Sequence, residues 1–142
     1  MSPLQKDMIL MKVKRIIENL EDLQDVVRLG WEHYRKTRKT RKLAERCLQE
    51  AIEAASDINS HFLVEGGHGA PEDYFAGFIK SGEAKIIPET LAEKLAPCSG
   101  VRNRIVHEYD KLDHALIYKS IQNALALFPK YVSAIEKKLR KI

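Results

Sequence analysis

The sequence predicts an all-α fold, an antiparallel bundle of four main helices plus a short helix, forming one domain over residues 1–142. Apolar side chains recur at steps of three and four over long segments, and no segment alternates as a strand would. Only 7% of the residues are aromatic and 31% are charged, a composition that favours helices over sheets. A chain of 142 residues can bury about two-thirds of its unfolded surface in one core.

The first helix is predicted over about residues 4–34, where an apolar stripe is followed by Gly30, which weakens the end of the helix. The stripe consists of Ile9, Val13, Ile16, Leu20, Leu23 and Val27. Residues 35–42 then carry six positive charges and form a corner between helices. This basic run could neutralise phosphates of a nucleic acid, or it could be a solvated corner without a partner.

A second helix is predicted to follow, with small alanines that let a neighbouring helix approach closely. Its buried side comprises Ala44, Leu48, Ala51, Ala55, Ile58 and Phe62. The Gly- and Pro-containing segment 66–71 ends it. We interpret this segment as a turn, because no strand precedes it and it lacks the Lys-Ser/Thr ending of a phosphate-binding loop.

The last third of the chain is predicted to contain shorter helices and then a long one. A short helix lies around residues 74–79 and is closed by Ser81-Gly82, and Pro88 opens a helix over 89–96. Pro97 and Ser99-Gly100 predict a kink or break before a helix over 102–107. Asp113 is the expected N-cap of the final helix, with a kink at Pro129. Its apolar stripe is Ile117, Ile121, Ala124, Phe128, Tyr131 and Ile135.

Composition also limits the classes of function. No apolar run approaches the roughly 20 residues of a membrane span, and the N-terminus does not look like a secretory signal, so we expect a cytoplasmic protein with no membrane partner. Cys47 and Cys98 are expected to be packing residues rather than a disulfide. With no cysteine cluster and no HExxH pattern, we expect no metal and no cofactor. The net charge of +4 permits a polyanionic partner.

The segment Arg102 to Tyr109 is the strongest candidate for chemistry. A histidine, here His107, can take or give a proton near neutral pH, and an arginine, here Arg102, offers a planar charged fork that suits a phosphate. At 100° per residue, Asn103 and His107 lie within about 40° of each other on one helix face. Arg102 lies about 140° from His107, but its long side chain can reach round the helix.

These residue types could cleave RNA without a metal. The 2′-hydroxyl would attack the adjacent phosphorus, a base would remove its proton, an acid would protonate the leaving 5′-oxygen, and arginine would stabilise the phosphoryl charge. One histidine cannot easily make both proton transfers, so we expect a homodimer that brings two copies of the segment together.

Arg102-x4-His107-x-Tyr109 resembles the RX4HXY motif of HepT toxins, a branch of the HEPN group, and the polar Asn103 after the arginine fits the same pattern. The resemblance covers nearly the whole chain, best over residues 44–135. It extends to Asp57-Ile58, Glu72-Asp73-Tyr74, Ile87-Pro88, the segments 91–95 and 100–103, and Val106 to Asp110. Pro97 is less regular than the family pattern and puts the continuity of the motif helix in question.

The resemblance implies a dimeric, metal-independent ribonuclease toxin acting on RNA, in a family some of whose members act on tRNA, with Arg102 and His107 as the catalytic pair. It also implies an antitoxin partner, an MNT-type nucleotidyltransferase that silences the toxin by transferring AMP to Tyr109. A nucleotide attached two residues from His107 would add negative charge and block the place of the RNA.

Other residues have supporting or structural interpretations. Asp57 and His61 are four residues apart on one helix face. Asp57 could orient His107 or a motif arginine across the bundle, or it could belong to a solvated polar face. Trp31 is interpreted as an anchor in the core or in a dimer contact.

Two alternative functions use the same features. In the first, the protein is a non-catalytic helical module that accompanies a nucleotidyltransferase and binds a nucleotide or a partner through the same polar pocket. In the second, it is a plain dimeric scaffold, and the basic corner only contributes solubility.

Overall fold

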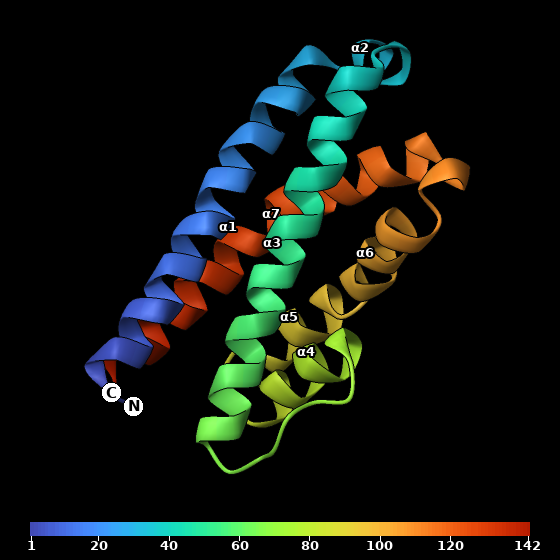
Figure 1. Cartoon of the computed structure of the whole chain (residues 1–142). Helices are drawn as coiled ribbons and strands as arrows, with labels where there is room; N and C mark the ends of the chain where they lie inside the picture. Colours follow the sequence, from blue (N-terminus) through green and yellow to red (C-terminus); the bar gives the residue numbers. More distant parts are fainter.

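The computed structural model describes residues 1–142 and is all-helical, as predicted (Figure 1). Its elements are α1 (Pro3–Leu29), α2 (Trp31–Lys36), α3 (Arg38–Glu65), α4 (Tyr74–Glu83), α5 (Glu89–Leu95), α6 (Cys98–His107), the 3-10 helix η1 (Tyr109–Lys111) and α7 (His114–Arg140). None of these helices is long and apolar enough to cross a membrane.

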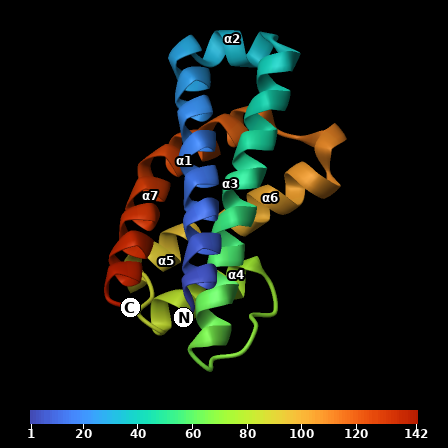
Figure 2. The same ribbon diagram turned by 60° about the vertical axis from the view of Figure 1, so that its left-hand side comes forward.

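The helices α1 and α3 form a long antiparallel pair joined by the short helix α2 (Figure 2). The single helix predicted over residues 4–34 is in fact two helices, because the chain breaks at Gly30. The φ of 87° at this residue is accessible to glycine at little cost. The corner therefore lies between Gly30 and Thr37, and the second half of the basic run, from Arg38, begins α3. Trp31 stacks against Tyr34, which confirms the prediction that Trp31 anchors the core.

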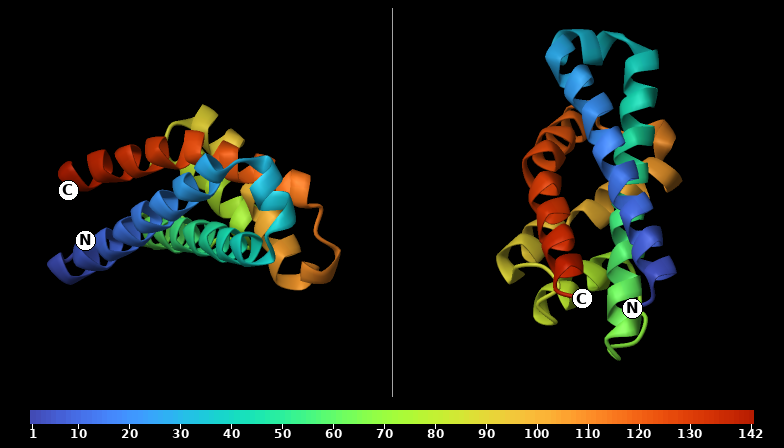
Figure 3. Two further views of the ribbon diagram at one scale, coloured as in Figure 1. Left: turned by 90° about the horizontal axis from the view of Figure 1, so that it is seen from above. Right: turned by 90° about the vertical axis from the view of Figure 1, so that its left-hand side faces the viewer.

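The long helix α7 packs against α1 and returns the chain to the end of the bundle where it began (Figure 3). Asp113 is its N-cap, as predicted, and accepts hydrogen bonds from the backbone N–H groups of Ala115 and Leu116. All six residues of the predicted stripe are buried. Pro129 lies exposed inside α7, and the helix curves but does not break (Figure 1).

A tight approach of α4 to α5 sets the lower part of the bundle. The Cβ of an alanine at position 82 would lie 2.6 Å from the Cβ of Ala92, so the contact between the two helices requires glycine. Ser81 and Gly82 therefore belong to α4 and do not close it, contrary to the prediction. The helix ends one residue later, at Glu83, and the turn that follows contains Lys85 with a positive φ of 59°.

The break before the motif helix occurs where the prolines and glycines predict it. Pro97 separates α5 from α6, and the backbone N–H of Ser99 donates to the carbonyl of Ala96 across the turn. From Cys98 to His107 α6 is continuous, so Pro97 does not disturb the segment that carries the motif. Both cysteines are free, as predicted.

Candidate active site

The helix α6 carries the motif on its outer side and one core residue on its inner side. Ile105 is buried in the common core, whereas Asn103 and His107 are exposed. Arg102 lies half-buried between these two sides, where α6 packs on α3 and α4. The packing of α6 therefore fixes the backbone position of Arg102, whereas His107 lies exposed at the end of the helix.

The Arg102 guanidinium is held from two elements at once. Its Nε and Nη2 donate to the same Oε2 atom of Glu53 on α3, at 2.9 and 2.8 Å. Its central carbon lies 5.0 Å from the ring centroid of Tyr74 on α4, a cation–π distance. Its Nη1 donates to Oδ1 of Asn103 at 3.3 Å. The side chains of Arg102 and Glu53 are 21% and 29% exposed, so the ion pair is largely shielded and still reachable from solvent.

A pocket of about 320 Å³ opens beside this guanidinium. It is lined by Asp73, Tyr74, Phe75, Ser99, Arg102 and Asn103. Asp73 caps α4 by accepting a hydrogen bond from the backbone N–H of Ala76, which fixes the first turn of α4 at the pocket. The Phe75 residue is 50% exposed, unusual for a large aromatic side chain. The pocket thus combines a cation for a phosphate with aromatic surface for a nucleobase.

His107 is the last residue of α6, and it lies about 1.4 turns, or about 7.5 Å of helix rise, beyond Arg102. It is exposed at the C-terminal end of the helix. Tyr109 follows in η1 and is 74% exposed. Both side chains are available to a substrate or to another protein.

The structure does not bring Asp57 to the motif, so our hypothesis that Asp57 orients His107 or a motif arginine is corrected. Asp57 is exposed on the side of α3 that faces α1, and its carboxylate pairs with Nζ of Lys12 at 2.9 Å. Asp57 and His61 do line one pocket together, as their spacing predicted.

The carboxylate that contacts Arg102 is Glu53, one helical turn before Asp57. Sequence reasoning missed it because Glu53, Asp57 and His61 share one stripe of α3, and only the register between α3 and α6 selects among them. Reasoning from the sequence also missed the part played by Tyr74 and Phe75. The position of Tyr74 immediately after the N-cap Asp73 was the available signal for where α4 begins.

A comparison with solved structures defines the class of fold. A tri-AMPylated HEPN toxin of Shewanella oneidensis, solved in complex with an MNT antitoxin, superposes with a TM-score of 0.84 at 24% sequence identity. The match covers 92% of this chain and 98% of that chain. The all-α bundle described above is therefore the HEPN toxin fold.

Sequence comparisons then define the family within this class. The profile of the ribonuclease HepT-like family matches residues 16–135. A tRNA nuclease HepT of Aphanizomenon flos-aquae is 36% identical over 116 residues, which are 82% of this chain and 79% of that protein. An mRNA nuclease HepT of Shewanella oneidensis is 27% identical over 63% of this chain and 67% of its own. The chain belongs to the HepT-like ribonuclease family, which confirms the resemblance noted in its motif.

Proposed function

We propose that this protein is the metal-independent endoribonuclease toxin of a toxin–antitoxin pair and that Arg102 and His107 cleave the RNA. The observation that carries the proposal is the Arg102 guanidinium, held by Glu53 over Tyr74 at the mouth of a pocket. His107 stands exposed at the end of the same helix. Membership in a ribonuclease family supports the assignment. We expect the protein to act in the cytoplasm, where its RNA substrates are found.

The reaction follows from these groups. The 2′-oxygen of a ribose bonds to the adjacent phosphorus while the bond from phosphorus to the 5′-oxygen breaks, which leaves a 2′,3′-cyclic phosphate and a 5′-hydroxyl. An imidazole of His107 accepts the proton of the 2′-hydroxyl, and a protonated imidazole donates to the departing 5′-oxygen. The guanidinium of Arg102 stabilises the negative charge on the phosphoryl oxygens.

Two proton transfers at one phosphate favour two histidines, and a homodimer would supply the second. Asn103, His107 and Tyr109 are all exposed at the end of α6 and in η1, so a second copy of the chain can approach them. Light scattering on the purified protein should give twice the mass of the chain. A monomeric mass in a preparation that cleaves RNA would contradict this part of the proposal.

Two substitutions test the catalytic assignment. His107→Ala and Arg102→Ala should each lower the cleavage of tRNA in EDTA by at least about a hundredfold. General acid–base catalysis contributes that much for His107, and electrostatic stabilisation of the transition state contributes about as much for Arg102. Arg104→Ala is the matched control, because Arg104 is an exposed cation on the same helix without a contact to the pocket. Equal loss in the control, or unchanged cleavage in the His107 variant, would refute the assignment.

We also propose that an MNT-type nucleotidyltransferase is the antitoxin and that it adenylylates Tyr109. The Tyr109 Oη would attack the α-phosphorus of ATP, so that a bond from tyrosine to phosphorus forms, pyrophosphate leaves and the phenolic proton passes to solvent. An exposed fraction of 74% makes this hydroxyl accessible to a second active site. Intact mass should rise by whole AMP units when antitoxin and ATP are present, and Tyr109→Phe should remove the increase. An unchanged increase in that variant would place the modification elsewhere.

A second candidate function, a non-catalytic module that binds a nucleotide or a partner beside a nucleotidyltransferase, uses the same pocket. The observation that favours it is the pairing of Arg102 with Glu53, which already balances the charge of the guanidinium. A phosphate must then compete with a carboxylate that is in place. Under this alternative, unmodified protein would bind AMP or RNA in a manner sensitive to Arg102→Ala and would leave every tested RNA intact.

A further inference from the structure

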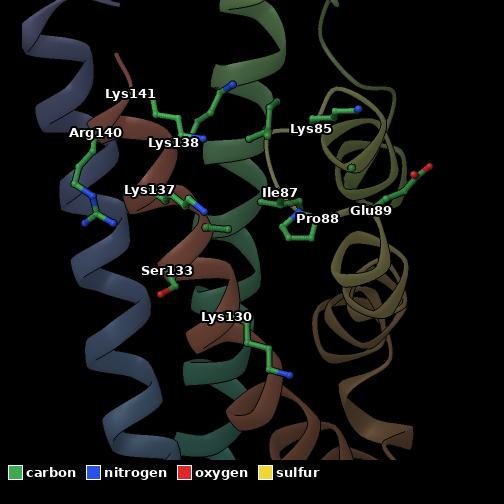
Figure 4. A pocket seen from close by; sticks show the side chains of 13 residues that line it. Lys85, Ile87, Pro88, Glu89, Lys130, Ser133, Lys137, Lys138, Arg140 and Lys141 are labelled. Atoms are coloured by element: carbon green, nitrogen blue, oxygen red, sulfur yellow. The ribbon is translucent and has the colours of Figure 1, made fainter.

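A strongly basic groove lies away from the motif, between the C-terminal half of α7 and the turn that joins α4 to α5 (Figure 4). Its volume is about 650 Å³. The cations that line it are Lys85, Lys130, Lys137, Lys138, Arg140 and Lys141. Glu89 is its one carboxylate.

The net positive charge of the residues that line the groove is larger than the net charge of the whole chain. Six cations against one carboxylate leave a net +5 among its lining residues, whereas the complete chain carries +4. All residues outside the groove therefore sum to −1. None of the six cations forms an ion pair within the chain, unlike Arg35 and Lys36 of the basic corner, which both contact Glu32. The charge of the groove is thus available to a partner.

Helix geometry aligns part of this charge along one wall. Lys130, Lys137 and Lys141 are seven and eleven residues apart, which places them within about 40° of one another around α7. They extend over about 16 Å of its axis. Such a row can contact successive negative charges of an extended polyanion.

Lys85 contributes a cation from the other wall at a position where a side chain carries a backbone cost. Its φ of 59° is the left-handed conformation that closes α4, with the backbone N–H of Ile86 donating to the carbonyl of Ser81. Residues with a Cβ are disfavoured in this conformation, whereas glycine adopts it readily. Glycine would close the helix with less backbone strain, so the geometry of the turn does not account for a lysine at position 85.

We propose that this groove binds the phosphate backbone of the RNA substrate, as an anchor remote from the site of cleavage. The proposal rests on the ribonuclease function proposed above. Ile86 and Ile87 line the groove but are buried, so the groove offers few exposed apolar anchors to a protein. Lysines are also depleted at protein interfaces, whereas they bind phosphates as point charges without reading sequence.

The position of the groove determines which RNAs can use it. Lys130 and Lys141 follow the start of α7 by 16 and 27 residues, about 24 and 40 Å of helix rise, and the motif helix ends just before α7 begins. Figure 1 shows the end of the motif helix near the start of α7, and the C-terminus of α7 at the other end of the bundle. The Arg102 pocket lies at the first turn of α4 and the near edge of the groove follows its last turn, about 15 Å of helix rise away. An RNA of two or three nucleotides in the Arg102 pocket is therefore too short to reach the lysine row on α7, whereas a folded RNA the size of a tRNA spans both.

Binding measurements in a His107→Ala background test the proposal without cleavage of the probe. The groove variant Lys130→Gln/Lys137→Gln/Lys141→Gln should raise the Kd for unmodified tRNA about tenfold or more. It should also reduce the slope of log K against log salt by about 2 to 3, since each phosphate contact contributes roughly 0.7–0.9. The Kd for an RNA of three nucleotides should stay within about twofold. The Lys85→Gly variant should weaken tRNA binding and melt no lower than its parent.

The matched control is Lys14→Gln/Lys94→Gln/Lys119→Gln, which removes three exposed and unpaired lysines that lie outside the groove, the Arg102 pocket and the basic run. An equal loss of tRNA binding in this control would overturn the proposal, as would unchanged binding in the groove variant. The proposal would also be overturned if the groove variant bound RNA normally but was no longer neutralised by the antitoxin. That result would assign the groove to a protein partner.

The ribonuclease proposal is judged separately. If the protein with His107 cleaves tRNA and the groove variant still binds tRNA normally, only the groove proposal is rejected. Groove-dependent binding without any cleavage rejects only the ribonuclease.

Discussion

Replacing Glu53 by alanine removes the carboxylate that holds the Arg102 guanidinium. Two N–H groups of Arg102 then lose their acceptor, while the contact with Tyr74 and the hydrogen bond to Asn103 remain. The guanidinium becomes free to leave the pocket, so a phosphate must fix its position during binding. The expected result is a lower rate of cleavage by a protein that is still folded.

The magnitude follows from the bonds and their exposure. Hydrogen bonds to a charged group contribute about 1.5–3 kcal/mol, and the 21% and 29% exposure of the two side chains favours the lower end of that range. With about 1.4 kcal/mol per tenfold change in rate, the lower end of that range corresponds to a fall in kcat/KM of about tenfold or slightly more in Glu53→Ala. Glu53→Gln keeps an oxygen acceptor, so it should lose less than about tenfold.

Cleavage of a fluorescent tRNA in EDTA measures the effect, with a thermal melt as the test of folding. Asp57→Ala is the matched control, because Asp57 lies one turn away on the same helix and pairs with Lys12 at the surface. It should retain the activity of the unsubstituted protein, since a surface ion pair contributes about 0–1 kcal/mol. Activity within twofold in Glu53→Ala, or an equal loss in Asp57→Ala, would refute the positioning of Arg102 by Glu53.

Gly82→Ala should lower the free energy of unfolding by about 1 kcal/mol or more, because the new Cβ lies 2.6 Å from that of Ala92, and an unchanged urea midpoint would contradict this contact. Phe75→Leu should raise KM for RNA about five- to tenfold with little change in kcat if the exposed ring stacks on a base, whereas Phe75→Tyr should not. Equal KM values in all three proteins would exclude stacking. Burial raises the pKa of Cys98 to about 11, so at pH 8 its thiolate fraction is about one in a thousand. In a Cys47→Ser background, iodoacetamide should therefore label the folded protein about a hundredfold more slowly than the denatured one, and equal rates would show that the thiol is not shielded.

The order of the helices could be predicted because local signals determine it. Apolar residues at steps of three and four gave α1, α3 and α7, and Asp113 marked the start of α7 through its own side chain. The errors fell at boundaries where a single backbone angle decides. Gly30 breaks the chain at a φ of 87°, and Lys85 closes α4 at a φ of 59°, three residues after the expected stop at Ser81-Gly82.

The relative placement of Arg102 and His107 could be predicted because both lie in α6, whereas the residues that contact Arg102 come from other helices. Five residues of one helix place the two side chains about 1.4 turns apart. The choice of Glu53 over Asp57 depends on how far α6 slides along α3, and the contact of Arg102 with Tyr74 depends on α4. No pattern along the chain encodes such a register between helices.

The central claim is that His107 and Arg102 cleave RNA by attack of the 2′-hydroxyl, without a metal ion. Analysis of the ends produced from tRNA by unmodified protein in EDTA tests it most directly. The account predicts fragments with a 2′,3′-cyclic phosphate and a 5′-hydroxyl, absent from reactions with His107→Ala. Fragments with a 3′-hydroxyl and a 5′-phosphate, or cleavage that stops when divalent ions are chelated, would contradict it.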